Sequence, residues 1–235
     1  MPDEVLADPP ALSLLEQRVL GVLIEKQKTT PDVYPMTPNG LVTGCNQKSN
    51  RDPVLSLTDD QVFATLEQLR ERGLVMRVQS GRVDKWRHLL YEAWKVEKAE
   101  IAMLAELFLR GPQTEGELRT RVSRMEPIDT LEILRELLHK LAERKFVVYL
   151  GPEGRRGTMI AHGCQDEAAL EAIRSGHGSG LHIQASDPAV IPFPSSSGSE
   201  IAELRKQLDE LRLQVSSLAD VVNALQQQQG DAPTP

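Results

Sequence analysis

The sequence is poor in aromatic residues and cysteine, and it has no long apolar run. Phe, Trp and Tyr make up 4% of its 235 residues, so a core must be built mainly from aliphatic side chains, which favours packed helices. Two cysteines, Cys45 and Cys164, cannot make a disulfide framework. No apolar stretch approaches the roughly 20 residues that span a bilayer, and the acidic N-terminus lacks the basic region of a secretory signal. We therefore expect a reduced, cytoplasmic protein with no membrane association.

The net charge of −7 is unevenly distributed along the chain. Residues 1–94 hold 11 Lys/Arg and 13 Asp/Glu, whereas residues 95–165 hold 12 and 11. Residues 166–235 hold 4 and 10, so most of the acidity belongs to the C-terminal segment. A nearly neutral body neither requires nor excludes a nucleic-acid partner, because the placement of charge matters more than its sum.

Residues 12–94 give one complete pattern of elements. Leu and Val recur at helical spacing in 12–27, Thr37-Pro38 is a typical helix start, and Thr58 with Gln61 forms a capping box. We expect the helix that Thr58 opens to bury Val62, Phe63, Leu66 and Leu69 and to end at Gly73. The expected elements are helices at 12–27, 38–45 and 58–73, and strands at 74–78 and 85–89.

The same order returns in residues 95–165. An amphipathic helix over 96–110 stops at Gly111-Pro112, Thr114 and Glu117 cap a short helix, and Asp129 with Glu132 is expected to cap a third helix. That third helix is expected to bury Leu131, Leu134, Leu138 and Leu141. Strands are expected at 146–150 and 158–162, on either side of the turn GPEGRRG.

The two halves align directly, which indicates two copies of one domain. The segment 69–75, LRERGLV, matches LAERKFV at 141–147. Three helices followed by a hairpin are typical of a winged-helix domain, in which the hairpin is the wing. The alternative is an α+β domain without that topology. We predict an α+β, mostly α protein with winged-helix domains at 1–94 and 95–165, each with its own core.

The C-terminal segment has two parts. A short helix over DEAALEAIRS opens a linker, 166–199, that is rich in Gly, Ser and Pro. Residues 200–229 carry four unbroken heptads, which favour a two-stranded coiled coil and a homodimer. The alternative is that this helix docks onto the body of its own chain. The residues expected at the dimer interface are Ile201, Leu204, Leu208, Leu211, Val215, Leu218, Val222 and Leu225.

The segment TPNGLVTGCNQKSNRDPV, residues 37–54, resembles the signature of the YceH-like family of bacterial proteins of unknown function. The similarity extends over residues 12–163, through LEQLRERGLV and GPQTEGELRTRV. This resemblance implies tandem winged-helix domains, and it implies no activity, ligand or catalytic residue.

The sequence does not support an enzyme, a metal site or a cofactor. Cys45 has no nearby His to activate it, and a small residue at a helix end is typical of packing. His162 and Cys164 lack a second ligand pair at zinc spacing. No phosphate-binding loop or dinucleotide fingerprint is present.

Basic residues favour a nucleic-acid partner. They gather on the two expected hairpins, and a donor-rich loop precedes the third helix of the first half. The candidate contacts are Asn46, Gln47, Lys48, Asn50, Arg51, Arg77, Arg82, Lys85, Arg87, Arg155 and Arg156. We therefore predict a DNA-binding regulator that uses its wings and the 46–51 loop.

The third helices favour a different partner. Their expected outward faces carry Asp60, Glu67 and Glu71 in one half and Glu132, Glu136 and Glu143 in the other. Carboxylates there would be repelled by the phosphates that flank the major groove. The alternative function is therefore a protein-interaction scaffold that uses the winged-helix surfaces.

Overall fold

The fold is given by a computed structural model. It describes residues 9–80 and 83–174, all of which belong to one compact unit, Met1–Leu181. Three of the predicted features lie outside the described residues: the heptads, most of the linker, and Arg82 of the predicted first wing. In the described part of the chain, no helix is both long and apolar enough to cross a membrane.

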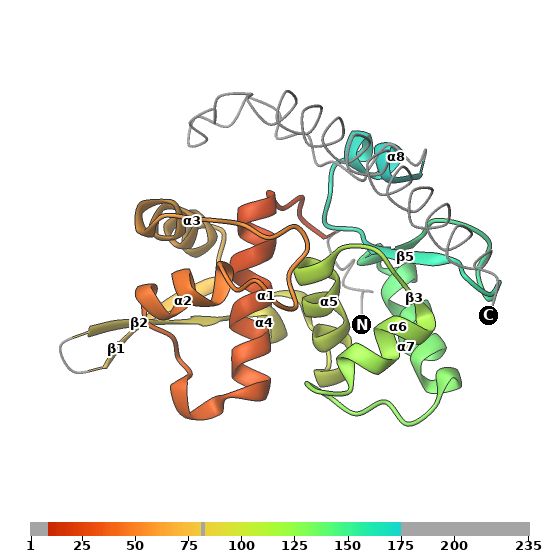
Figure 1. Ribbon diagram of the computed structural model, residues 1–235, viewed down its shortest axis with the longest axis horizontal. Helices are drawn as coiled ribbons and strands as arrows, with labels where there is room; N and C mark the ends of the chain where they lie inside the picture. Colours follow the sequence, from red (N-terminus) through yellow and green to blue (C-terminus); the bar gives the residue numbers. More distant parts are fainter. Residues whose placement is uncertain (1–8, 81–82, 175–235) are drawn as a thin grey trace, which may run out of the picture. The chain divides into compact units, whose positions relative to one another are not determined.

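The three helices and the hairpin predicted for the first half are present, together with two short helices, η1 and α4 (Figure 1). Helix α1 starts with a capping box between Ser13 and Glu16, α2 is capped by Thr37, and α3 starts with the predicted box of Thr58 and Gln61. The elements are α1 (Leu14–Thr29), the 3-10 helix η1 (Pro31–Val33), α2 (Pro38–Cys45), α3 (Asp59–Glu71), β1 (Val75–Ser80), β2 (Val83–His88) and α4 (Leu90–Trp94). Strands β1 and β2 pair antiparallel.

The second half repeats this order with one extra strand. Thr114 and Glu117 form the predicted capping box of α6. Strand β3 pairs with β5, so the sheet order is β3-β5-β4, whereas the first half has a single bridge between Met36 and Trp86 before α2. The elements are α5 (Lys98–Arg110), β3 (Gln113–Thr114), α6 (Glu115–Val122), α7 (Leu131–Glu143), β4 (Val147–Tyr149), β5 (Met159–His162) and α8 (Glu167–Arg174). The prediction of a mostly helical α+β protein is confirmed.

Three local predictions were wrong. Thr130, not Asp129, caps α7, and its hydroxyl accepts from the backbone N–H of Ile133. Phe63 is 48% exposed, because it lies about 100° around α3 from Val62 while Thr65 takes the inward position. Leu131 is only half-buried at the start of α7.

The two halves share one core instead of two separate ones. Buried side chains from both halves form a single contiguous cluster, and α1 packs along α5. The helices approach closely at Gly21, where a Cβ would lie 2.9 Å from the Leu109 side chain. Trp94 extends the contact by packing on Phe146, with ring centroids 5.2 Å apart. The expectation of a separate core in each half is therefore corrected, because α1 buries one face against α5.

Candidate functional site

The donor-rich loop that follows α2 is held in place by hydrogen bonds within the chain. The side chain of Asn46 accepts from the backbone N–H of Leu57 at 2.7 Å and donates to its carbonyl at 2.8 Å. Asn50 adopts a left-handed conformation with φ of 59°, which Asn tolerates better than most residues. The Asn46 side chain therefore ties the end of α2 to the segment before α3 and already has a structural partner.

Arg51 lies at the centre of this arrangement and is buried. Its guanidinium binds the Glu25 carboxylate at 2.6 and 3.4 Å. The remaining N–H groups donate to the Gly44 carbonyl, the Asn50 carbonyl and the Gln47 side chain, so all five donors are used. Burial alone would raise the pKa of Glu25, but the hydrogen bond and charge of Arg51, with Arg124, lower it below its ordinary value.

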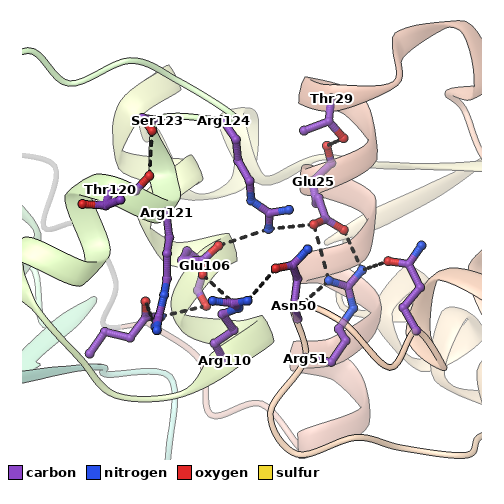
Figure 2. A network of polar contacts seen from close by, with 12 residues as sticks. Glu25, Thr29, Asn50, Arg51, Glu106, Arg110, Thr120, Arg121, Ser123 and Arg124 are labelled. Carbon is purple, nitrogen blue, oxygen red and sulfur yellow. Dashed lines mark hydrogen bonds and ion pairs between the residues drawn. The ribbon is translucent and has the colours of Figure 1, made fainter.

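This cluster continues into the second half. Arg124 lies between two carboxylates, 2.7 Å from Glu25 and 3.2 Å from Glu106 (Figure 2). Arg110 donates to the Asn50 side chain at 2.5 Å. We call Glu25, Asn50, Arg51, Glu106, Arg110 and Arg124 the junction network. Of the loop residues that the sequence nominated for nucleic acid, Asn50 contacts the second half through Arg110, and Arg51 belongs to the same network through Glu25.

Backbone contacts support the same junction. The N–H of Asp52 donates to the Leu109 carbonyl at 2.8 Å, and the N–H of Leu12 donates to the Cys164 carbonyl at 3.1 Å. Arg18 is buried on α1, where it donates to the carbonyls of Cys45 and Pro53. Burial, together with the charge of Arg51, lowers the pKa of Arg18 to about 10, so the side chain remains charged at neutral pH.

A polar cavity of about 260 Å³ opens beside the junction network. Its lining comes from both halves: Asn50, Arg51, Asp52, Arg110 and Arg121. Arg121 projects from α6 and donates to the Gln113 side chain at 2.7 Å. Three guanidiniums and one carboxylate therefore surround one opening.

The basic residues of the first hairpin lie on its surface. Arg77 is 3.4 Å from Asp84 across the strands, and Arg87 is 3.8 Å from Glu92. Lys85, which lies on β2, is half-exposed. Exposed ion pairs of this kind contribute about 0–1 kcal/mol, so these cations can exchange an intramolecular carboxylate for another anion.

The other candidate cations are also exposed. Arg155 and Arg156 lie in the turn between β4 and β5, and Lys48 lies in the loop after α2. The hairpin β1–β2 and the sheet β3-β5-β4 lie on opposite sides of the α1–α5 pair (Figure 1). The predicted residues therefore divide into exposed cations, on the two hairpins and at Lys48, and loop side chains with partners inside the chain.

The carboxylates expected on the outward faces of α3 and α7 are present, beside exposed Arg70 on α3 and exposed Arg135 and Lys140 on α7. Asp60 and Glu71 are exposed on α3, and Glu132, Glu136 and Glu143 are exposed on α7. An apolar side chain is exposed on each helix as well, with Phe63 at 48% and Ile133 at 42%. Apolar groups among carboxylates are unsuited to a phosphate backbone.

The buried thiols and imidazoles have no partner of catalytic type in the contacts described. Burial raises the pKa of Cys45 and that of Cys164 to about 12, so both remain thiols at neutral pH. Burial also lowers the pKa of His88 to about 4 and that of His162 to about 3. No three His, Cys, Asp or Glu side chains gather as a metal site within residues 9–80 and 83–174.

Sequence reasoning missed Glu25, Glu106, Arg110, Arg121 and Arg124. One signal was available, because Glu25 and Glu106 interrupt the apolar residues of their amphipathic helices. A carboxylate on a buried helix face needs a cation. Which cation meets it depends on contacts up to 99 residues apart, and these cannot be read from helical spacing.

Comparison with known proteins agrees with the resemblance seen in the sequence. The profile of a family described as "Protein of unknown function, DUF480" matches residues 12–154. A UPF0502 protein of Pseudomonas aeruginosa is 44% identical over 179 residues, covering 76% of this chain and 80% of that protein. UPF0502 proteins of Geobacter sulfurreducens (44% identity; 76% and 85% covered) and Rhodopirellula baltica (48% identity; 66% of each) are similar. The chain belongs to the DUF480 family.

Proposed function

We propose that the protein is a non-enzymatic regulator that binds nucleic acid through the wings of two winged-helix modules, residues 1–94 and 95–165. The order of three helices and a hairpin in each half supports the winged-helix assignment. The proposal depends most on one observation: Arg77 and Arg87 on the first hairpin lie at the surface in weak ion pairs, whereas Arg51 in the loop uses its donors internally.

The mode of contact follows from charge. Phosphates bind cations without regard to base sequence, and release of counterions makes that binding depend steeply on salt. The acidic faces of α3 and α7 oppose insertion of these helices into the major groove. The wings are therefore expected to contact the phosphate backbone, with Arg77, Lys85 and Arg87 on one wing and Arg155 and Arg156 on the other. Arg51 is left out of this surface because it is buried.

A fluorescence-anisotropy titration tests this proposal with duplex DNA, single-stranded DNA and RNA at several salt concentrations. Changing Arg82, Lys85 and Arg87 to Glu should abolish binding. A control with Arg70, Lys98 and Arg135 changed to Glu alters the net charge equally but leaves both hairpins intact. Absence of binding by all three probes at low salt, or equal loss in the control, contradicts the proposal.

A second candidate function is supported by the exposed apolar residue on α3. Phe63 lies on a helix whose outward face carries Asp60, Glu67 and Glu71. A basic partner protein with an apolar anchor would complement this face. Such a partner should co-purify with the chain and be lost when Glu67 and Glu71 become Lys. An unchanged set of co-purifying proteins would exclude this face as the binding surface.

The heptads in residues 200–229 support a dimer in either case. Deletion from Glu200 onward should halve the molar mass seen by light scattering. An unchanged mass would mean that these heptads do not pair two copies.

A further inference from the structure

The cavity of about 260 Å³ beside the junction network, which we call the junction cavity, is lined mainly by guanidinium groups. Arg51 uses all five of its N–H groups within the first half, so it contributes charge to the cavity and no free donor. Arg110 and Arg121 also line the opening, and in the contacts described each uses part of its donors. The remaining N–H groups of these two side chains are available to a ligand.

The two guanidiniums are also held in place. Arg110 is fixed by the Asn50 side chain at 2.5 Å and by Glu106, which lies 3.4 Å from its Nε. Arg121 is fixed by Gln113, which in turn donates to the carbonyls of Glu106 and Gly111. Because these partners restrain both side chains, a ligand would lose little affinity to the ordering of Arg110 and Arg121.

The charge around the cavity also favours an anion. Five cations lie in or directly behind the lining: Arg18, Arg51, Arg110, Arg121 and Arg124. Four carboxylates pair with them or line the cavity: Glu25, Asp52, Glu106 and Glu117. Glu117 is about half-exposed, and the oxygen that lies 3.5 Å from Arg121 is not the one that accepts from Thr114, so breaking the contact with Arg121 costs little. This group of side chains therefore carries one net positive charge.

We infer that this cavity binds a small oxyanion of the phosphate type, held by Arg110 and Arg121 at the seam between the two halves. Planar guanidiniums bind tetrahedral phosphate oxygens with paired hydrogen bonds. Both of these arginines belong to the second half, and the first half contributes the charge of Arg51 to the site. The site is separate from the hairpins that the proposed function uses.

Thermal unfolding of the full chain in inorganic phosphate, at constant ionic strength set with NaCl, tests the inference. Phosphate should raise the unfolding temperature in a saturable way, because a ligand that binds only the native state stabilises it. Arg121→Gln is the informative variant, since the contacts of Arg121 lie within the second half and its loss leaves the junction network intact. It should weaken phosphate binding at least tenfold, as measured by calorimetry.

Arg135→Gln is the matched control. Arg135 is exposed, pairs with Glu115 and lies outside the cavity, so the variant should bind phosphate like the unmodified chain. Equal loss in both variants would show a general charge effect and overturn the inference, as would the absence of saturable binding. Circular dichroism confirms that each variant is folded.

Two further probes identify the source of the phosphate group. If the ligand is a small phosphorylated molecule, AMP should bind and lose affinity in Arg121→Gln, while an oligonucleotide binds both proteins equally. If the group belongs to a strand, the oligonucleotide should lose affinity in the same variant. Binding to the wings is tested by the hairpin variants, so failure of the cavity and failure of the proposed function give different results.

Discussion

At the scale of single residues, the most consequential side chain is Glu25. Its side chain is 3% exposed and pairs with both Arg51 and Arg124, and Arg124 is shared with Glu106. Changing Glu25 to Gln keeps its shape but leaves a buried guanidinium without its carboxylate, so the free energy of unfolding should fall by about 3 kcal/mol. Urea denaturation measures this change.

The control for Glu25 is an exposed ion pair. Asp84→Asn breaks the contact with Arg77 on the first hairpin and should change stability by less than about 1 kcal/mol. Similar losses for both variants would mean that the junction network is no more important than a surface pair.

The buried histidines predict how stability depends on pH. Burial lowers the pKa of His88 to about 4 and that of His162 to about 3, below the ordinary value near 6.5. Between these values the unfolded chain binds protons that the native chain does not, so stability falls as pH decreases below about 6.5. Each histidine contributes a slope of up to about 1.4 kcal/mol per pH unit.

Urea midpoints between pH 5 and 7 test this dependence. His162→Gln should remove about half of the slope. A slope that this substitution leaves unchanged would show that His162 is not one of the groups responsible.

At the scale of elements, the approach of α1 to α5 depends on Gly21. A Cβ there would lie 2.9 Å from the Leu109 side chain and 3.3 Å from the Phe108 Cβ. Gly21→Ala should therefore destabilise the protein by about 1–3 kcal/mol, although Ala is the better helix former. Gly116→Ala is the control in α6, where a Cβ meets nothing within 4 Å, and it should stabilise slightly. Equal effects would contradict a tight contact at Gly21.

The elements also show how far sequence reasoning reaches. Capping boxes, prolines and helical spacing act over a few residues, and they correctly predicted the starts of α2, α3 and α6 and both hairpins. The short elements α4 and β3 give no periodic signal and were missed. Arg51 shows the main limit, because its basic neighbours indicated an exposed loop while its partner Glu25 lies 26 residues away on α1. Whether a side chain such as Arg51 is buried between the two halves depends on tertiary contacts, which local sequence patterns do not predict.

At the scale of the whole molecule, the described residues form one body. The loop of the family signature, the α1–α5 contact and the arginines of the second half meet at one seam. This arrangement fixes how the two hairpins are placed relative to each other, so any ligand that contacts both would meet a fixed spacing. We therefore expect the two halves to fold and unfold together.

The two cysteines test that claim directly, because each half contains one and both are fully buried. The unmodified chain is equilibrated across a range of urea concentrations, given a short pulse of a thiol reagent and analysed by mass spectrometry. We expect molecules with no label or with two labels at every concentration, because Cys45 and Cys164 should become accessible in one transition. A substantial population with a single label near the midpoint would show that the halves unfold separately and would contradict the account.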